Sequence, residues 1–135
     1  MTDQDWTELG RRAVACRRFR WRRGMSTICG LVAQSNDDAN GRVYFGQWVE
    51  PHPDWLPDLR DPATLGCLLA LVREAVEPER APGDWPMVCT YQNAAKKWGV
   101  GAWLNESGKA TFAALVLPTY DTEAAALVAA LGSAP

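Results

Sequence analysis

The sequence predicts an α/β protein of the α+β kind, a three-layer α/β/α sandwich whose sheet is mostly antiparallel. Helical periodicity is found in three separate segments, near residues 3–15, 62–76 and 122–131. Between them lie alternating or apolar segments joined by short turn-forming stretches, which is typical of antiparallel strands. With 135 residues, of which 47% are hydrophobic, the chain is long enough for one domain with a substantial core. We therefore expect residues 1–135 to form a single domain.

The first predicted helix covers residues 3–15, with Thr2 or Asp3 as its cap and an apolar stripe that begins at Trp6. Residues 17–23 follow, where two aromatic residues alternate with arginines. This period of two predicts a strand with one apolar and one basic edge.

Two β-rich stretches, residues 26–34 and 42–49, flank the turn-forming residues 35–41, and this order predicts a hairpin. Residues 50–60 contain three prolines and show no regular period. We expect this segment to form an extended connection along the surface.

The second predicted helix covers residues 62–76, with Asp61 as its cap and Pro62 in its first turn. It is apolar nearly all round, which indicates that it is buried on more than one side. Either the rest of the chain surrounds it or a second subunit covers it, so a homodimer or higher homo-oligomer is one expectation.

A loop containing Pro78, Pro82 and Pro86 precedes the remaining predicted elements. These are strands at residues 87–92, 98–104 and 110–117, a tight turn at 105–108 and a helix at 122–131. Both alternating faces of these strands are apolar, as expected of a sheet that is covered on both sides.

Charge is unevenly distributed along the chain. The net charge is −2, but residues 1–30 carry a formal charge of +4 and residues 31–135 one of −6. Five arginines within residues 17–23 account for much of this difference. Guanidinium groups bind phosphate through two parallel hydrogen bonds, and a neighbouring ring can stack on a base. The segment therefore predicts an anionic nucleotide ligand, while the alternative is an edge strand whose arginines are simply solvated.

Seven tryptophans are present in the chain, several times the usual frequency. Tryptophans at strand ends and in loops are typical of binding surfaces, although they can also close the rim of a small core. Lys96 and Lys97 form a second small basic cluster, which a solvated turn would also explain. The candidate ligand-binding residues are Arg17, Arg18, Arg20, Trp21, Arg22, Arg23, Trp48, Lys96, Lys97 and Trp103.

No catalytic or metal-binding motif is evident. The four cysteines are widely spaced and His52 is the single histidine, so we expect no zinc site, no other metal, no cofactor and no enzymatic activity. No apolar run reaches the ~18 residues that span a bilayer, and the first residues are acidic where a signal peptide would be basic. We expect a protein of the bacterial cytoplasm that does not contact a membrane.

Four blocks of the sequence, residues 6–16, 21–25, 56–75 and 122–131, together resemble the phage ABA-sandwich domain family of small bacteriophage and prophage proteins. The block Asp61-Pro-Ala-Thr-Leu-Gly-Cys67 is the most specific part. The resemblance covers a third to a half of the chain and implies helix–sheet–helix layering and a phage origin. It supplies no functional residues, and a shared fold does not assign function.

These observations together predict a non-catalytic phage accessory protein, an anti-defence protein that sequesters a phosphate-bearing nucleotide signal of antiviral immunity. Two other functions stay open. The chain could inhibit a host defence enzyme or nuclease by binding to that protein, or it could bind nucleic acid weakly through the arginine segment.

Overall fold

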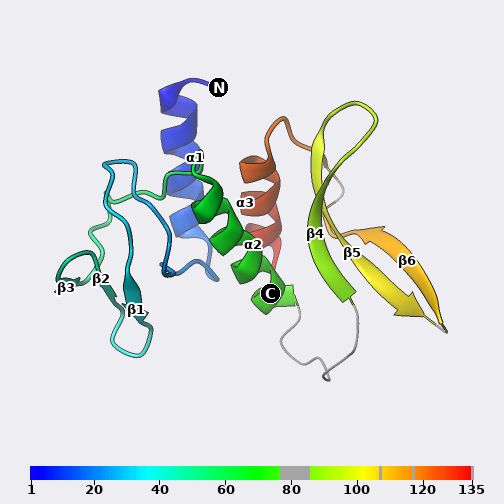
Figure 1. The fold of residues 1–135 in the computed structure, drawn as a ribbon. Helices are drawn as coiled ribbons and strands as arrows, with labels where there is room; N and C mark the ends of the chain where they lie inside the picture. The colour runs from blue at the N-terminus through cyan, green and yellow to red at the C-terminus, as the bar shows by residue number, and fades with distance from the viewer. Residues whose placement is uncertain (77–85, 107, 117, 135) are drawn as a thin grey trace. The chain divides into compact units, whose positions relative to one another are not determined.

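The computed structural model describes residues 1–76, 86–106, 108–116 and 118–134. Within this part the chain forms three helices and two three-stranded antiparallel sheets (Figure 1). The predicted α+β class with antiparallel strands is therefore confirmed, although the strands form two sheets where the sequence predicted one. The chain divides into two compact units, Met1–Cys67 and Leu68–Pro135. The expectation of a single domain stays a prediction.

Helix α1 spans Asp3–Ala15, as predicted. Thr2 caps it: its Oγ1 accepts a hydrogen bond from the backbone N–H of Asp5 at 3.2 Å, and its own N–H donates to the Asp5 carboxylate at 2.7 Å. Gly10 is buried on this helix. A Cβ at Gly10 would lie 3.3 Å from the Cβ of Leu56, so this glycine allows the loop around Leu56 to pack closely on α1.

Residues 17–23 form no strand, contrary to the prediction. The chain instead turns where the backbone N–H of Met25 donates to the carbonyl of Arg22 at 3.1 Å. Gly24 completes the turn with a φ of +97°, a conformation that glycine adopts without strain. The buried side chain of Trp21 still faces the core. The alternating pattern thus predicted correctly that Trp21 is buried, but it gave the wrong backbone structure.

The predicted strand at residues 26–34 also differs, because it folds back on itself. The N–H of Thr27 donates to the carbonyl of Leu31 at 2.7 Å, and the Thr27 hydroxyl accepts from the N–H of Leu31 at 3.0 Å. Gly30, with a φ of +93°, lies in the turn between them. Gly30 thus interrupts a stretch of sequence whose other residues favour a strand.

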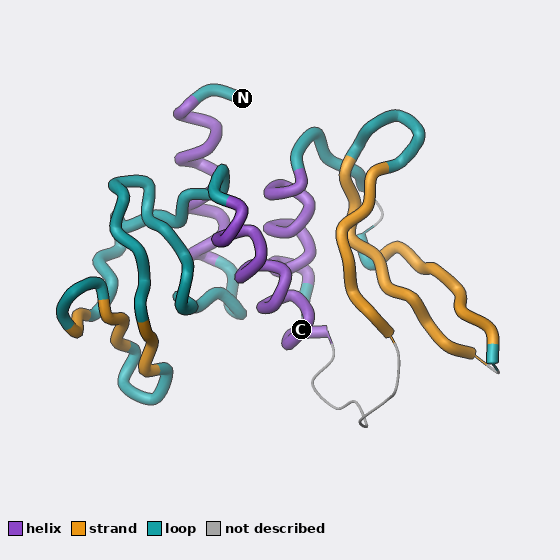
Figure 2. Tube along the Cα trace, viewed as in Figure 1, coloured by secondary structure: helices purple, strands orange, loops and turns teal. Residues whose placement is uncertain are grey.

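The first sheet contains β1 (Ser35–Asp37), β2 (Arg42–Tyr44) and β3 (Trp48–Val49), in that order and antiparallel. The predicted hairpin is present, but its first strand lies within the expected turn. The core of this unit is formed mainly by residues of α1 and of loops, which make up most of the segment between α1 and α2 (Figure 2). Its buried hydrophobic residues are Leu9, Ala13, Trp21, Met25, Ala33, Val43, Leu56 and Leu59.

Helix α2 spans Pro62–Val76, as predicted, and continues from the first unit into the second. Asp61 caps it, since its carboxylate accepts hydrogen bonds from the Thr64 N–H at 2.9 Å and the Thr64 hydroxyl at 2.8 Å. The Thr64 oxygen in turn accepts from the N–H of Ser26 at 2.9 Å, so the cap also holds the loop at residue 26. Thr64 is fully buried.

The apolar residues of α2 are covered to different degrees. Leu68, Leu71, Val72 and Ala75 are buried, whereas Leu65, Cys67, Leu69 and Ala70 are partly exposed. The chain itself therefore covers much of this helix. Association of two or more copies stays a prediction.

The second sheet contains β4 (Pro86–Gln92), β5 (Trp98–Glu106) and β6 (Lys109–Ala114), paired antiparallel in the order β4-β5-β6. These strands match the predicted positions within a few residues. Helix α3 (Glu123–Ser133) packs on β5 and β4, and its N-cap is Thr122 (Figure 1). The loop predicted around Pro78 and Pro82 lies outside the described residues.

We expect the Asp61 cap to make the free energy of unfolding depend on pH. Hydrogen bonds from Thr64, with a further one from Ser26, lower the pKa of Asp61 below its ordinary 3.8. A lowered pKa in the folded state means that the carboxylate stabilises the fold fully above about pH 4 and loses this effect as the pH falls through the folded pKa. Asp61→Asn should therefore cost about 1 kcal/mol at neutral pH, and less in acid.

Urea denaturation of the wild type and of Asp61→Asn at several pH values measures this difference. The control is Glu50→Gln, because Glu50 is exposed and its carboxylate makes no ion pair within the described residues. A difference between wild type and Asp61→Asn that stays constant from neutral pH to about pH 3 would contradict the assignment.

Candidate ligand-binding site

The first unit contains a hollow of about 540 Å³, which is within the size range of about 300–1,000 Å³ that is usual for small-molecule sites. Its walls come from the end of α1, the arginine segment, the β1–β2 hairpin and the proline-rich loop that follows β3. The residues that line it are Val14, Phe19, Arg20, Trp21, Asp37, Asp38, Gly41, Arg42, Val43, Pro51, His52, Pro53 and Trp55.

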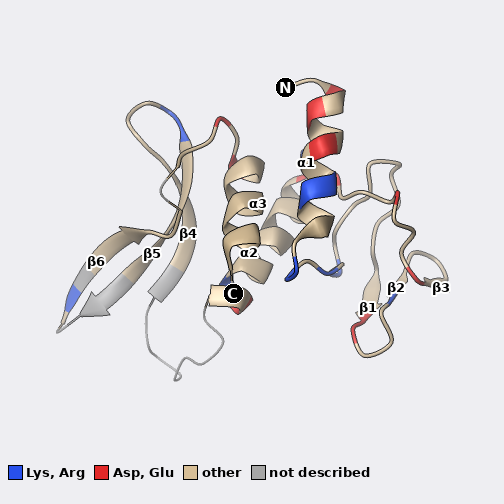
Figure 3. Cartoon of the chain, turned by 180° about the vertical axis from the view of Figure 1, so that it is seen from behind, with Lys and Arg blue, Asp and Glu red and all other residues tan. Residues whose placement is uncertain are grey.

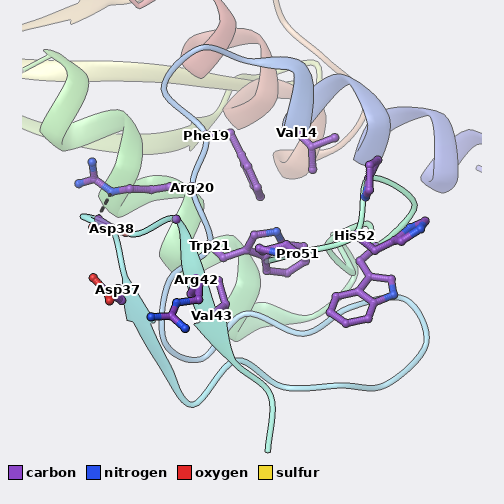
Figure 4. Close-up of a pocket in the computed structure, with 13 residues that line it drawn as sticks. Val14, Phe19, Arg20, Trp21, Asp37, Asp38, Arg42, Val43, Pro51 and His52 are labelled. Atoms are coloured by element: carbon purple, nitrogen blue, oxygen red, sulfur yellow. Dashed lines mark ion pairs between the residues drawn. The ribbon is translucent and has the colours of Figure 1, made fainter. Parts of the chain in front are cut away.

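Charged side chains gather at one end of this hollow (Figure 4). Arg20 forms an ion pair with Asp38, with 3.6 Å between Nε and Oδ2. Asp37 and Arg42 are paired residues on the neighbouring strands β1 and β2. Two guanidinium groups and two carboxylates therefore share this end, and their formal charges cancel.

Asp37 is held in its ionised form. The side-chain amide of Asn40 donates to the Asp37 carboxylate at 2.7 Å. This hydrogen bond, and to a smaller extent the backbone N–H groups of the same turn and the charge of Arg42, lower the pKa of Asp37. The hollow thus keeps a negative charge beside Arg42 at neutral pH.

Arg42 is the guanidinium that is most available to a ligand. Its charge acts on Asp37, but it makes no hydrogen bond or ion pair with any residue in the described part of the chain. Arg20, by contrast, has Asp38 as a partner. An anion that enters the hollow could therefore bind Arg42 without displacing a carboxylate from it.

Aromatic rings extend from the charged end towards His52 (Figure 4). Trp21, which is 7% exposed, contacts Phe19 and Phe45 edge to face, with 5.7 Å between ring centroids in both cases. Phe45 contacts Trp55 in the same way at 5.5 Å. These contacts fix the rings in one arrangement. Trp21 therefore forms a rigid floor for the hollow, and the more exposed Trp55 forms part of its wall.

Two prolines and two hydrogen bonds constrain the loop that carries His52. Pro51 and Pro53 restrict the backbone on either side of the histidine. The N–H of Asp54 donates to Nδ1 of His52 at 3.1 Å, and the N–H of Trp55 donates to the His52 carbonyl at 2.9 Å. Since Nδ1 accepts a hydrogen bond, a neutral His52 carries its proton on Nε2, where it can donate to a ligand.

The predicted candidates divide between several places. Arg20 and Trp21 line the hollow, whereas Arg17, Arg18, Arg22 and Arg23 do not. The first turn of α1 is acidic, whereas basic residues lie near the end of this helix and in the segment that follows it (Figure 3). Trp48 lies on β3, packs against Tyr44 with 5.4 Å between ring centroids, and is 48% exposed.

The other three candidates lie in the second unit. Lys96 and Lys97 are in the turn between β4 and β5, where Lys97 forms an ion pair with Asp121. Trp103 lies on β5. The grouping of these residues with the arginine segment in one ligand site stays a prediction.

Sequence reasoning missed Arg42, Trp55 and His52 as parts of one site. A usable signal was present for Arg42, since a hairpin closed by residues 38–41 places it opposite Asp37. Trp55 and His52 are brought to the hollow by an irregular loop, and no period in the sequence indicates which way such a loop faces.

Comparisons with known proteins identify no relative: no family profile, no curated protein and no solved structure matches the chain. The phage-family resemblance stays a prediction. Within the described residues, no three histidine, cysteine, aspartate or glutamate side chains are grouped so that they could hold a metal ion. No described helix combines the length and the apolar character needed to cross a bilayer.

We expect removal of the Trp21 indole to unfold the first unit rather than only to weaken a ligand. Trp21→Ala should lower the free energy of unfolding by about 3–5 kcal/mol, because it deletes a large buried side chain with two ring contacts. Trp21→Phe should cost less, since most of the volume is kept. Urea denaturation measures both. A loss below 1 kcal/mol for Trp21→Ala would show that the floor is not part of the core.

Proposed function

We propose that the first unit binds a small nucleotide that carries a single phosphate group or a similarly compact anion. The observation that supports this is the hollow itself, which combines Arg20 and Trp21 with Arg42 and with the ring-lined wall. A ring of the ligand would lie against Trp55 above the Trp21 floor. Its phosphate would reach Arg42 and Arg20 at the charged end.

The carboxylates select among anions. Asp37 and Asp38 lie at the same end as the two arginines, so a ligand with several phosphates would bring like charges together. One phosphate can contact Arg42 while avoiding much of this repulsion. The carboxylates can also accept hydrogen bonds from the amino or hydroxyl groups of a nucleoside. The same argument disfavours the backbone of a nucleic acid as the ligand of this hollow.

Binding without turnover is the proposed activity. The protein would lower the concentration of a free nucleotide by holding it, and in a phage setting that nucleotide would be a signal of antiviral immunity. The setting rests on the resemblance of the sequence alone, while the ligand chemistry rests on the hollow.

Arg42→Ala tests the proposed site. Thermal-shift and calorimetric titrations of the full chain with cyclic and linear nucleoside monophosphates should show binding to the wild type, because a ligand specific for the folded state raises the melting temperature. Loss of a charge-assisted hydrogen bond should weaken binding about 10- to 100-fold in Arg42→Ala.

The matched control is Arg11→Ala, an exposed arginine on α1 that does not line the hollow. It should bind as the wild type does. Two results would refute the proposal: no nucleotide binds the wild type, or Arg42→Ala and Arg11→Ala bind equally well.

Asp38→Asn tests the selectivity for a single phosphate. The change removes one negative charge from this end of the hollow, the carboxylate that pairs with Arg20. We expect nucleoside triphosphates to bind about fivefold more tightly to this variant than to the wild type, the effect of ~1 kcal/mol for a partly exposed charge pair. Calorimetry with mono- and triphosphates of one nucleoside gives the ratio. An unchanged ratio would show that the carboxylates do not select the ligand.

A further inference from the structure

The second sheet has one buried face and one exposed aromatic face. Val88, Val100 and Ala102 are buried on the face that packs against α3. The strand register places the alternate residues on the opposite face. Among the residues whose side chains are described, this aromatic face contains Cys89, Tyr91, Gly99, Gly101, Trp103, Phe112 and Ala114, and none of these seven is charged.

Three rings form a continuous group on the aromatic face. Phe112 contacts Tyr91 with 5.0 Å between ring centroids and Trp103 with 5.2 Å. Trp103 is 43% exposed and Phe112 is 36% exposed. Large rings so exposed on a sheet are a feature of binding surfaces rather than of a core.

Glycines hold two of these rings close to the backbone. A Cβ at Gly99 would lie 2.5 Å from Cζ of Tyr91, and a Cβ at Gly101 would lie 2.3 Å from Cζ of Phe112. No side chain other than hydrogen fits beneath either ring. The rings therefore rest on the sheet itself, and this arrangement fixes them before any ligand arrives.

Lysines lie at one end of this face. Lys96 and Lys97 are in the β4–β5 turn, which Asn93 closes with two hydrogen bonds. Its side-chain oxygen accepts from the N–H of Lys97 and its backbone carbonyl accepts from the N–H of Lys96, both at 2.9 Å. Lys97 pairs with Asp121. Lys96 has no ion pair within the described residues, so its ammonium can bind an anion.

We propose that the aromatic face binds a short stretch of single-stranded nucleic acid by stacking two or three bases on Trp103, Phe112 and Tyr91. Exposed rings on a β-sheet are a recurring means of binding unpaired bases, because every base offers a planar face. Lys96 would contact a phosphate at the end of the stretch. This surface shares no residue with the lining of the hollow and does not depend on the function proposed for the hollow.

A second copy of the chain is a poorer fit to this face. One face of three strands that lie about 4.8 Å apart and are about six residues long has an area of roughly 300 Å². Two such faces together would bury about 600 Å², which is below the ~1,000 Å² expected of a specific protein interface. The same area suffices for a few bases. The uncharged face also predicts weak dependence on salt, with a loss well below tenfold between about 50 and 200 mM if only one phosphate is contacted.

The test uses the full chain and a short fluorescein-labelled oligothymidylate, with binding followed by fluorescence anisotropy. Trp103→Leu keeps an apolar side chain on the strand but removes the indole face. We expect it to weaken binding about 5- to 100-fold, the usual effect of losing one stacked base. Trp103→Tyr should restore most of the affinity. The matched control is Trp48→Leu, which removes an indole that is 48% exposed from β3 and should leave binding unchanged.

Circular dichroism and melting of each variant check that the sheet is intact. The proposal is wrong if the wild type does not bind the oligonucleotide, or if Trp103→Leu and Trp48→Leu weaken binding equally. It is also wrong if sedimentation shows that Trp103→Leu dissociates a dimer, because the face would then be occupied by a second copy. Arg42→Ala should bind the oligonucleotide normally, which separates this result from the test of the hollow.

Discussion

Burial of the Trp21 indole determines where the neighbouring Arg20 lies in the first unit. The segment that contains it has no strand to hold it, so its position depends on the ring contacts with Phe19 and Phe45. Once the indole faces the core, the preceding Arg20 is directed to the rim of the hollow, where it pairs with Asp38. An irregular backbone is thus positioned by side-chain packing rather than by a ladder of hydrogen bonds.

The two units achieve order in different ways. In the second unit, backbone pairing over β4, β5 and β6 fixes the rings, and the glycines beneath them set their height above the sheet. In the first unit, turns and caps fix the loops, as Thr64 does when it joins the start of α2 to Ser26. Loops of this kind can differ widely in sequence while α1 and its cap are unchanged, so they are suited to a ligand site.

The sequence predicted regular elements better than it predicted the site. Helices α1, α2 and α3 were located by period and caps, and the strands of the second sheet were located by apolar pattern, because these signals are local. The strand predicted at residues 17–23 was wrong because alternation reports which side chains are buried and does not report whether a pairing partner exists. Arg20 and Trp21 were found from their own segment, but Arg42 and Trp55 reach them only through tertiary packing.

The contact between Gly101 and Phe112 has a consequence for how this chain can evolve. A Cβ at position 101 would lie 2.3 Å from Cζ of Phe112 and 2.9 Å from the carbonyl oxygen of Ala113. A smaller residue at 112 would remove the first collision but not the second, because the second is with the backbone of the neighbouring strand. Glycine is therefore expected to persist at position 101 among descendants of this sequence even where the ring at 112 is replaced, and an unchanged glycine there would mark the sheet in divergent chains.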